Sequence, residues 1–280
     1  MRPFTAIHNP PLTPYPIPLK KTYPLITIAT VTYNAGRVLD RTIRSVEAQA
    51  YPRIEHLIID ACSKDETLSL IRCYVERNTQ PMHNIRVLSE SDKGLYDAMN
   101  KALRMAEGDY IVFLNAGDKL HADNTIEALV KTIDWEYRGV NPAVVYGETD
   151  LVDDAGRFLR HRRLRAPEQL TPHSFLSGML VCHQSFYVRT DLARQFRYNL
   201  DYRFSADYDW CIRILQHAAR CRNRVINTHL ILTDYLSEGL TTKNHRRSLM
   251  ERFRIMAKHY GTSRAVCAHL WFVLRALFRR

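Results

Sequence analysis

The sequence predicts a doubly wound α/β fold, a mostly parallel sheet with helices on both faces. Two observations carry this prediction. Strand-like and helix-like segments alternate four times with short connections between residues 25 and 114, which is the rhythm of a parallel sheet with right-handed crossovers. At 280 residues and 46% hydrophobic composition, the chain can also bury one large core.

The first half is expected to supply four strands and three helices. The strands are short, apolar, β-branched runs, and the helices carry apolar residues at helical spacing. Ser63 is placed to cap the second helix. The expected strands cover 25–32, 54–60, 84–88 and 109–114, and the expected helices cover 36–49, 63–77 and 94–106.

After about residue 140 the rhythm changes, and we expect a mixed second half. Segments 143–146 and 156–164 look like shorter strands joined by an Asp-Asp-Ala-Gly turn. A helix over 205–217 and a strand near 224–232 follow. The chain thus divides into a proline-rich extended arm at 1–24, an α/β domain at 25–242 and a basic helical tail at 243–280.

The charge is concentrated in the tail. Of the formal net charge of +11, the tail carries +9, because it holds ten Lys and Arg residues and one acid, Glu251. A nucleic-acid-binding protein usually carries its basic residues on the folded face itself. We therefore expect no nucleic-acid partner, although binding of nucleic acid by the tail is an alternative.

Cysteine and proline usage indicate a cytosolic protein. The six cysteines are scattered, with no CxxC pair and no zinc-type spacing, which favours reduced thiols. Seven of the twelve prolines fall in residues 1–24, a composition typical of an extended arm and not of a signal peptide. No apolar run reaches the ~18 residues that span a bilayer.

Each predicted parallel strand ends in polar residues, which together outline a crevice at the carboxyl edge of the sheet. Asp118 follows an apolar strand and is suited to hold a divalent cation against phosphate. Tyr33 could pack on a base, and Asp60 could bond a base or ribose, or only cap the turn after it. The first strand–helix connection, 33–37, has neither GxGxxG nor a P-loop. This favours a nucleotide held partly by a metal over a dinucleotide dehydrogenase or a P-loop NTPase.

Seven short motifs follow one another along the chain: Thr30–Asn34, Ile59–Thr67, Asp92–Lys101, Phe113–Asp118, His183–Ser185, Ser205–Asp209 and Ser237–Thr241. On these motifs the sequence resembles family 2 glycosyltransferases of the GT-A fold, in particular bacterial exopolysaccharide enzymes of the colanic-acid type. The resemblance covers about 25–245 and implies a Rossmann-like GT-A domain over 25–242.

The resemblance also implies roles for individual residues. Asp118 matches the metal-binding acid for Mg²⁺ or Mn²⁺, and Asp207 matches the catalytic base. His183, Gln184 and Asp209 would lie near the acceptor or the diphosphate, although a lone histidine is equally often structural. The implied nucleotide-sugar positions are Thr32, Tyr33, Asn34, Asp60, Asp92, Lys93 and Asn115.

The sequence departs from the family pattern at two places. Asn115 stands where many relatives have a first aspartate, which should weaken metal binding because it removes a carboxylate. Ala61-Cys62 stands where the family commonly has two glycines. Asp207 suits the role of base because a carboxylate at a helix start stays ionised and can accept the proton of an attacking hydroxyl. Asp209 is the alternative base.

Three segments keep more than one interpretation. From Ser263 to Arg280, Arg264, Arg275 and Arg279 fall within about 60° at helical spacing. With Trp271 and Phe272 this predicts an interfacial helix on an anionic membrane surface, or else a helix packed on its own domain or on a homodimer partner. The run 157–165 adds to the same basic face as the tail, or binds the acceptor's phosphates, or is a solvated strand edge. The stretch 237–241 either closes over the diphosphate or is a plain turn.

Taken together, these patterns predict an inverting glycosyltransferase. It would move a sugar from a nucleoside diphosphate sugar to a lipid-linked saccharide acceptor in exopolysaccharide biosynthesis, at the cytoplasmic, inner face of the cell membrane. The alternative is a non-catalytic nucleotide-sugar-binding or assembly protein, which the incomplete acidic motif would suit.

Overall fold

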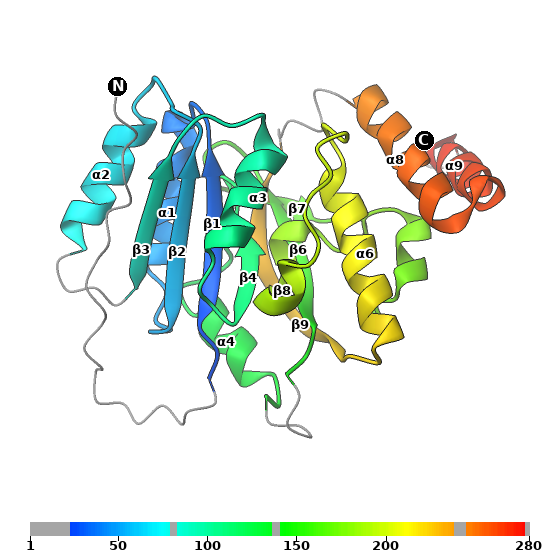
Figure 1. Ribbon diagram of the computed structural model, residues 1–280, viewed down its shortest axis with the longest axis horizontal. Helices are drawn as coiled ribbons and strands as arrows, with labels where there is room; N and C mark the ends of the chain where they lie inside the picture. Colours follow the sequence, from blue (N-terminus) through cyan, green and yellow to red (C-terminus); the bar gives the residue numbers. More distant parts are fainter. Residues whose placement is uncertain (1–22, 79–82, 136–140, 238–244, 278–280) are drawn as a thin grey trace.

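The first half of the chain forms the predicted parallel sheet. The structure is a computed structural model and describes residues 23–78, 83–135, 141–237 and 245–277. Strands β1 (Ile26–Thr32), β2 (Ile54–Asp60), β3 (Asn84–Ser89) and β4 (Tyr110–Phe113) lie in the order β3-β2-β1-β4 and pair in parallel (Figure 1). They alternate with α1 (Gly36–Glu47), α2 (Thr67–Arg77) and α3 (Leu95–Met105).

Helices cover both faces of this sheet because its strands are apolar on both sides. Leu57 and Ile59 of β2 belong to the cluster that includes Met99 of α3, whereas Ile58 packs with Leu39 of α1 and Tyr74 of α2. The predicted fold class, an α/β sheet with helices on both faces, is confirmed.

The second half extends the sheet in mixed directions. β8 (Phe186–Arg189) joins β4 antiparallel, β6 (Val144–Val152) joins β8 antiparallel, and β9 (Val225–Leu236) pairs with β6 in parallel. β5 (Lys119–Leu120) pairs antiparallel with β9, and β7 (Phe158–His161) pairs antiparallel with β6. The ladder between β6 and β9 shifts register beside Gly147, where a Cβ atom would lie 2.5 Å from the Leu230 carbonyl oxygen.

Short helices fill the remaining connections: α4 (Thr125–Lys131), η2 (Pro172–Ser177), η3 (His183–Ser185) and α5 (Thr190–Ala193). The longer α6 (Ala206–Arg220) covers the second half of the sheet on the same side as α3 (Figure 1).

The prediction that Ser63 caps α2 is wrong. The helix begins at Thr67, and its N-cap, Glu66, makes no side-chain capping bond. Ser63 instead donates its hydroxyl to Asp60 at 2.6 Å and accepts the backbone N–H of Asn34 at 2.8 Å. The buried Asp60 carboxylate needs hydrogen-bond donors, and the Ser63 hydroxyl is one of them. Ser63 therefore joins the end of β2 to the turn after β1.

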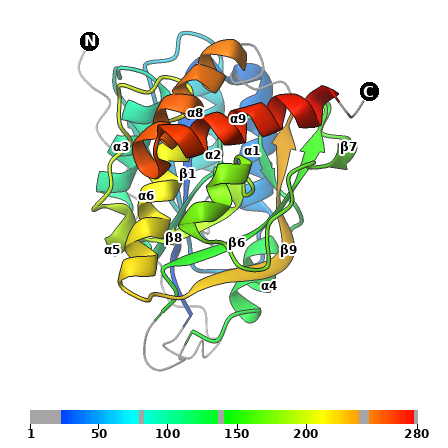
Figure 2. The same cartoon turned by 90° about the vertical axis from the view of Figure 1, so that its right-hand side faces the viewer.

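The basic tail forms two helices, α8 (His245–Tyr260) and α9 (Thr262–Leu277). Ile255 and Met256 of α8 are buried in the main core, and the Glu251 carboxylate accepts the backbone N–H groups of Arg203 and Phe204 before α6. α9 lies against α8 on the outer side of the molecule (Figure 2). In the part of the chain that the structure describes, no helix combines the length and the apolar character required to cross a bilayer.

Candidate active site

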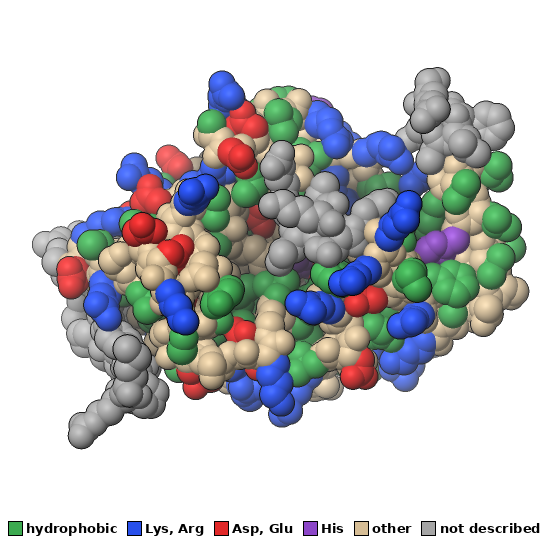
Figure 3. Space-filling view, turned by 90° about the horizontal axis from the view of Figure 1, so that it is seen from above, with side chains coloured by type: hydrophobic (Ala, Val, Ile, Leu, Met, Phe, Trp, Pro, Cys, Tyr) green, Lys and Arg blue, Asp and Glu red, His purple; other side chains and the backbone are tan. Residues whose placement is uncertain are grey.

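A large cavity opens at the carboxyl ends of the parallel strands. Its volume is about 1520 Å³, more than the ~300–1,000 Å³ typical of a small-molecule pocket, so there is room for two substrates. It is lined from β1, the loop before α3, the β4–β5 turn, η3, α6 and α8. Figure 3 looks onto this end of the molecule, where Lys and Arg side chains gather beside the tail helices.

The turn after β1 presents an aromatic ring to the cavity. Tyr33 lines the cavity with its side chain 64% exposed, which leaves the ring free to stack on a ligand. Asn34 takes a left-handed backbone conformation with φ of 49°. Its side-chain oxygen accepts the Lys64 N–H at 2.9 Å, which ties the turn to the loop after β2.

Asp60 lies behind the cavity wall, not at its surface. The residue is fully buried, and its carboxylate accepts the hydroxyls of Thr32, Ser63 and Ser89. These bonds join the ends of β1, β2 and β3. Thr32 lines the cavity, so Asp60 shapes the site through its neighbours.

Asp92 and Lys93 line the cavity from the loop before α3. The Asp92 carboxylate accepts the N–H of Gly94 at 2.7 Å. Burial raises the pKa of Asp92 and outweighs this bond, which lowers it. The loop therefore places one acidic and one basic side chain, Asp92 and Lys93, at the same edge of the cavity.

The turn between β4 and β5 carries the candidate cation ligands. Asp118 is 3% exposed, and its two oxygens accept the Leu236 N–H at 2.9 Å and the Gln184 amide at 2.8 Å. Burial raises the pKa of Asp118 to about 6. The side-chain oxygen of Asn115 is buried and has no hydrogen-bond partner among the described residues. A carboxylate and a free amide oxygen fit Mg²⁺ or Mn²⁺, which prefer oxygen ligands.

A line of hydrogen bonds joins this turn to α6. The Asn115 amide nitrogen lies 3.4 Å from His183 Nε2, and His183 Nδ1 lies 3.3 Å from Asp207 Oδ2. Tyr96 donates its hydroxyl to Asp207 Oδ1 at 2.9 Å. A proton on Nδ1 satisfies both histidine contacts, because Nδ1 then donates to Asp207 and Nε2 accepts from Asn115. This arrangement leaves the Asn115 oxygen free for a ligand.

Asp207 is an ionised carboxylate inside the cavity. Burial alone would raise its pKa, but the hydrogen bond from His183, the charge of Arg252 and the Tyr96 hydroxyl together lower the pKa of Asp207 below its ordinary value. Its place in the first turn of α6 adds to this effect. Asp207 can therefore accept a proton from a hydroxyl group brought beside it.

Asp209 lies on another side of α6. It is 1% exposed, and its oxygens bond Arg213 at 2.7 Å and His259 at 2.8 Å. The Arg213 bond lies within α6, whereas the His259 bond joins α6 to α8. The structure thus separates Asp207, which lines the cavity, from Asp209, which holds two helices together.

Several cavity residues carry no separate prediction from the sequence. Tyr96 falls inside the matched segment 92–101, so that motif could have pointed to it. Arg247 and Arg252 come from the tail, where no local signal links them to the site. Arg160 and Arg163 lie in the basic run 157–165, and their place on the cavity wall agrees with the phosphate-binding interpretation. Of the stretch 237–241, the structure describes Ser237 alone.

The carboxyl-edge cavity, with an ionised carboxylate across from candidate cation ligands, defines a transferase of the glycosyltransferase type. The family model for glycosyl transferase family 2 matches residues 27–196. The chain belongs to this family, and it is a glycosyltransferase. The resemblance to the family is therefore confirmed, while the colanic-acid-type resemblance stays a prediction.

The relatives described below are all named as glycosyltransferases. A PGL/p-HBAD biosynthesis glycosyltransferase of Mycobacterium tuberculosis is 27% identical over 217 residues, covering 77% of this chain and 78% of that protein. An uncharacterized glycosyltransferase of the same species is 30% identical over 193 residues, covering 68% of each. The putative teichuronic acid biosynthesis glycosyltransferase TuaG of Bacillus subtilis is 36% identical over 100 residues, 36% of this chain and 38% of TuaG.

Solved structures share the fold. S. aureus TarS 1-349 in complex with UDP superposes with a TM-score of 0.62 at 17% identity, covering 86% of this chain and 68% of that one. The mannosyltransferase PcManGT from Pyrobaculum calidifontis, in complex with GDP-Man and Mn²⁺, gives 0.58 at 18% identity, covering 89% and 74%. The GT-A fold is thereby confirmed.

Proposed function

We propose that this chain is an inverting glycosyltransferase that moves a sugar from a nucleoside diphosphate sugar to a lipid-linked saccharide in exopolysaccharide biosynthesis. The observation that carries the proposal is Asp207, held in the cavity between His183 and Tyr96, with Asn115 at the far end of the same line of bonds. TarS with UDP and PcManGT with GDP-Man support a nucleotide-sugar donor.

The donor would occupy the half of the cavity next to β1 and the loop before α3. Tyr33 would stack on the base, and Lys93 would face the diphosphate. Asn115 and Asp118 would hold a Mg²⁺ or Mn²⁺ ion, and the Mn²⁺ in PcManGT supports this cofactor. When bound there, the ion would act as a Lewis acid and would offset negative charge on the departing diphosphate.

Asp207 would act as the base. As the acceptor hydroxyl attacks the anomeric carbon, its oxygen forms the new glycosidic bond, and the bond to the nucleoside diphosphate breaks. The hydroxyl proton passes to the Asp207 carboxylate. Attack from the side opposite the leaving group inverts the configuration at that carbon.

The acceptor half of the cavity is basic. Arg203 lines the cavity from the residues before α6, Arg247 and Arg252 line it from α8, and Arg160 and Arg163 line it from β7 and the residues after it. A guanidinium group can donate two parallel N–H bonds to two oxygens of one phosphate. This supports an acceptor that carries a diphosphate, such as a saccharide on a lipid-diphosphate carrier.

The tail supports a position on the cytoplasmic face of the cell membrane. On α9, Leu270 and Trp271 are each 59% exposed and Val273 is 58% exposed. The same two-helix tail carries most of the positive net charge. An apolar helix face beside basic residues suits binding to anionic lipids.

A donor screen tests the proposal. Unfolding temperatures are measured with UDP-, GDP- and dTDP-sugars, each with Mn²⁺, Mg²⁺ or EDTA. We expect one nucleotide class to raise the unfolding temperature, and EDTA to remove that effect. Stabilisation that persists in EDTA would exclude the cation role of Asp118.

The Asp207→Asn variant tests the base. It should abolish sugar transfer while keeping the donor-induced rise in unfolding temperature, since the change leaves the donor half intact. Turnover retained in Asp207→Asn would contradict the assignment. Donor binding without transfer by the unaltered chain, given a lipid-linked acceptor and membranes, would favour a non-catalytic binding protein.

A further inference from the structure

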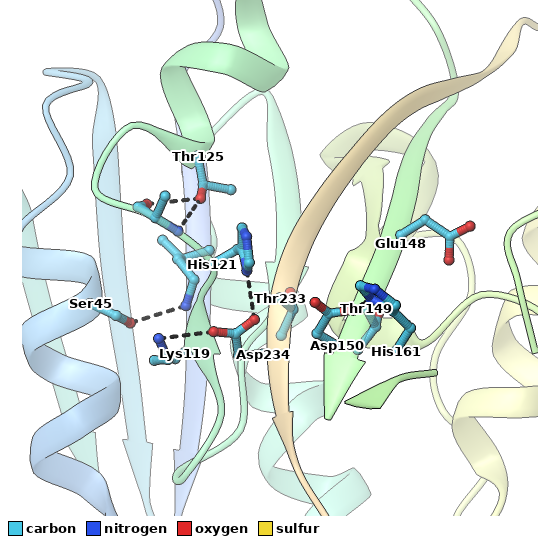
Figure 4. Close-up of polar contacts among 12 residues, drawn as sticks. Ser45, Lys119, His121, Thr125, Glu148, Thr149, Asp150, His161, Thr233 and Asp234 are labelled. Carbon is cyan, nitrogen blue, oxygen red and sulfur yellow. Dashed lines mark hydrogen bonds and ion pairs between the residues drawn. The ribbon is translucent and has the colours of Figure 1, made fainter. Parts of the chain in front are cut away.

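A second cluster of metal-ligating side chains lies where β5, β6 and β9 meet (Figure 4). His121 follows β5, Asp150 lies in β6, and Asp234 lies in β9. One ligand atom of each lies within 4.8 Å of the other two. We propose that His121, Asp150 and Asp234 bind one transition-metal ion of the Zn²⁺ class, apart from any cation in the candidate active site.

The cluster faces away from the cavity. Successive side chains of a strand point to opposite faces of the sheet. Thr149 bonds the Ser185 hydroxyl, and Thr233 donates to the Gln184 carbonyl oxygen, so both threonines face η3 at the cavity. Asp150 and Asp234, each the next residue in its strand, therefore point to the other face.

The two carboxylates form a like-charged pair inside the sheet. Asp150 and Asp234 are directly opposite in the register of β6 and β9, and they are 2% and 6% exposed. Like charges opposite one another on neighbouring strands are destabilising. Lys119 Nζ, 2.9 Å from Asp234 Oδ2, offsets one of the two charges. A divalent ion between the carboxylates would offset both.

The donor set selects the kind of metal. His121 Nδ1 lies 2.7 Å from Asp234 Oδ1, on the carboxylate oxygen that does not face Lys119. One imidazole nitrogen and two carboxylates suit Zn²⁺ and related ions, whereas Mg²⁺ and Ca²⁺ prefer oxygen alone. His161 Nδ1 lies 2.8 Å from Asp150 Oδ1 and positions that carboxylate, as partners of metal ligands do. The His121 side chain is 39% exposed, which gives the ion a path from solvent.

A metal here would stiffen the support of Asp118. It would join β5, β6 and β9, and β9 supplies the Leu236 N–H that bonds Asp118. Thr149 and Thr233, beside the two ligands, hold the η3 turn whose Gln184 also bonds Asp118. The proposed ion would therefore stabilise the back of the active site.

Cobalt(II) tests the site because Co²⁺ held by protein side chains at low coordination number absorbs visible light more strongly, and at longer wavelength, than hydrated Co²⁺. These bands of the bound ion are the readout. The full chain, freed of any affinity tag and treated with chelator, is titrated with Co²⁺ alone. The same titration is made with His121→Ala, with Asp150→Asn, and with His229→Ala as the control. His229 also lies on β9, but its side chain is 63% exposed and outside the cluster. Circular dichroism and urea unfolding confirm that each variant is folded.

We expect visible bands that saturate at one equivalent, persist in His229→Ala and in Asp118→Asn, and disappear in His121→Ala. Zn²⁺ should displace the Co²⁺ and raise the unfolding temperature of the unaltered chain, with no such rise in His121→Ala. Bands that survive in both His121→Ala and Asp150→Asn would overturn the proposal. So would bands lost in Asp118→Asn alone, or no bands at all.

Discussion

Two carboxylates that are two residues apart in the sequence have different tasks in the structure. Asp207 lines the cavity, and Asp209 joins α6 to α8. The helical period explains the difference, because residues two apart point about 200° away from each other. The sequence could place both at the start of a helix, but not tell which one faces the cavity. That depends on how α6 packs, which only long-range contacts decide.

Asp209→Asn should lower the free energy of unfolding by about 3 kcal/mol, the order expected when one partner of a buried ion pair is removed. Asp207→Asn should change it less, because the Asn side-chain oxygen can still accept the Tyr96 hydroxyl. Urea unfolding of both variants measures this contrast. An Asp209→Asn variant that is as stable as the unaltered chain but inactive would favour Asp209 as the base.

Asp118 predicts a pH dependence of cation binding. Because burial raises its pKa to about 6, a proton competes with the cation for the carboxylate near neutral pH. Mn²⁺ affinity should therefore fall as the pH drops through about 6, as titration calorimetry in the presence of the donor nucleotide would show. The dependence should be absent in Asp118→Asn. An affinity independent of pH in the unaltered chain would contradict a role for Asp118.

The raised pKa of Asp118 also affects stability without a cation. The protonated carboxyl fits the buried site best, so its contribution is complete below the ordinary pKa of 3.8 and is lost as the pH rises through about 6. Above about pH 6 a bound cation should restore this stability, because the cation neutralises the Asp118 carboxylate in place of the proton.

Local pattern predicted the first half of the chain better than the second. The elements at 26–113 are long, regular and apolar, so their periodicity is strong. β5, α4 and β8 span two, seven and four residues, too few to show a period. β6 and β9 run longer than expected because they stabilise each other across the ladder, a contact that no local window contains.

Helix α8 lies in the predicted basic tail, and it also contributes to the core and to the cavity. Ile255 and Met256 are buried in the core, and Arg247 and Arg252 line the cavity. The apolar positions of α8 could be found in the sequence. Which surface they cover could not, because that surface is built by α6, a helix that lies earlier in the chain.

Arg252 on α8 should tune the base. Its positive charge helps to lower the pKa of Asp207, so Arg252→Gln should raise that pKa and move the acidic limb of the kcat/KM profile to higher pH. Arg254→Gln is the matched control, because Arg254 is on the same helix but exposed and outside the cavity. Equal shifts in the two variants would mean that overall charge, and not Arg252, acts on Asp207.

At the scale of the whole molecule, the exposed side of α9 should bind anionic vesicles. Replacing a Leu that inserts into lipid removes roughly 2 kcal/mol, so Leu270→Gln should weaken vesicle binding more than tenfold. Leu159→Gln is the control, since Leu159 is 50% exposed on β7 and not on α9. Vesicle co-sedimentation at low and high salt measures both. Equal binding by the two variants would place the contact elsewhere.

The line of bonds from Asn115 through His183 to Asp207 and Tyr96 also bears on a side reaction. Both carboxylate oxygens of Asp207 are already engaged, one by His183 and one by Tyr96, and its lowered pKa makes it a weak base. Such a weak base does little to activate a water molecule that is not held in position. An acceptor hydroxyl, held in place by the rest of its own molecule, gains much more, because it stays beside the carboxylate long enough to react. Under the proposed role, the low basicity of Asp207 therefore slows hydrolysis of the sugar donor when no acceptor is bound.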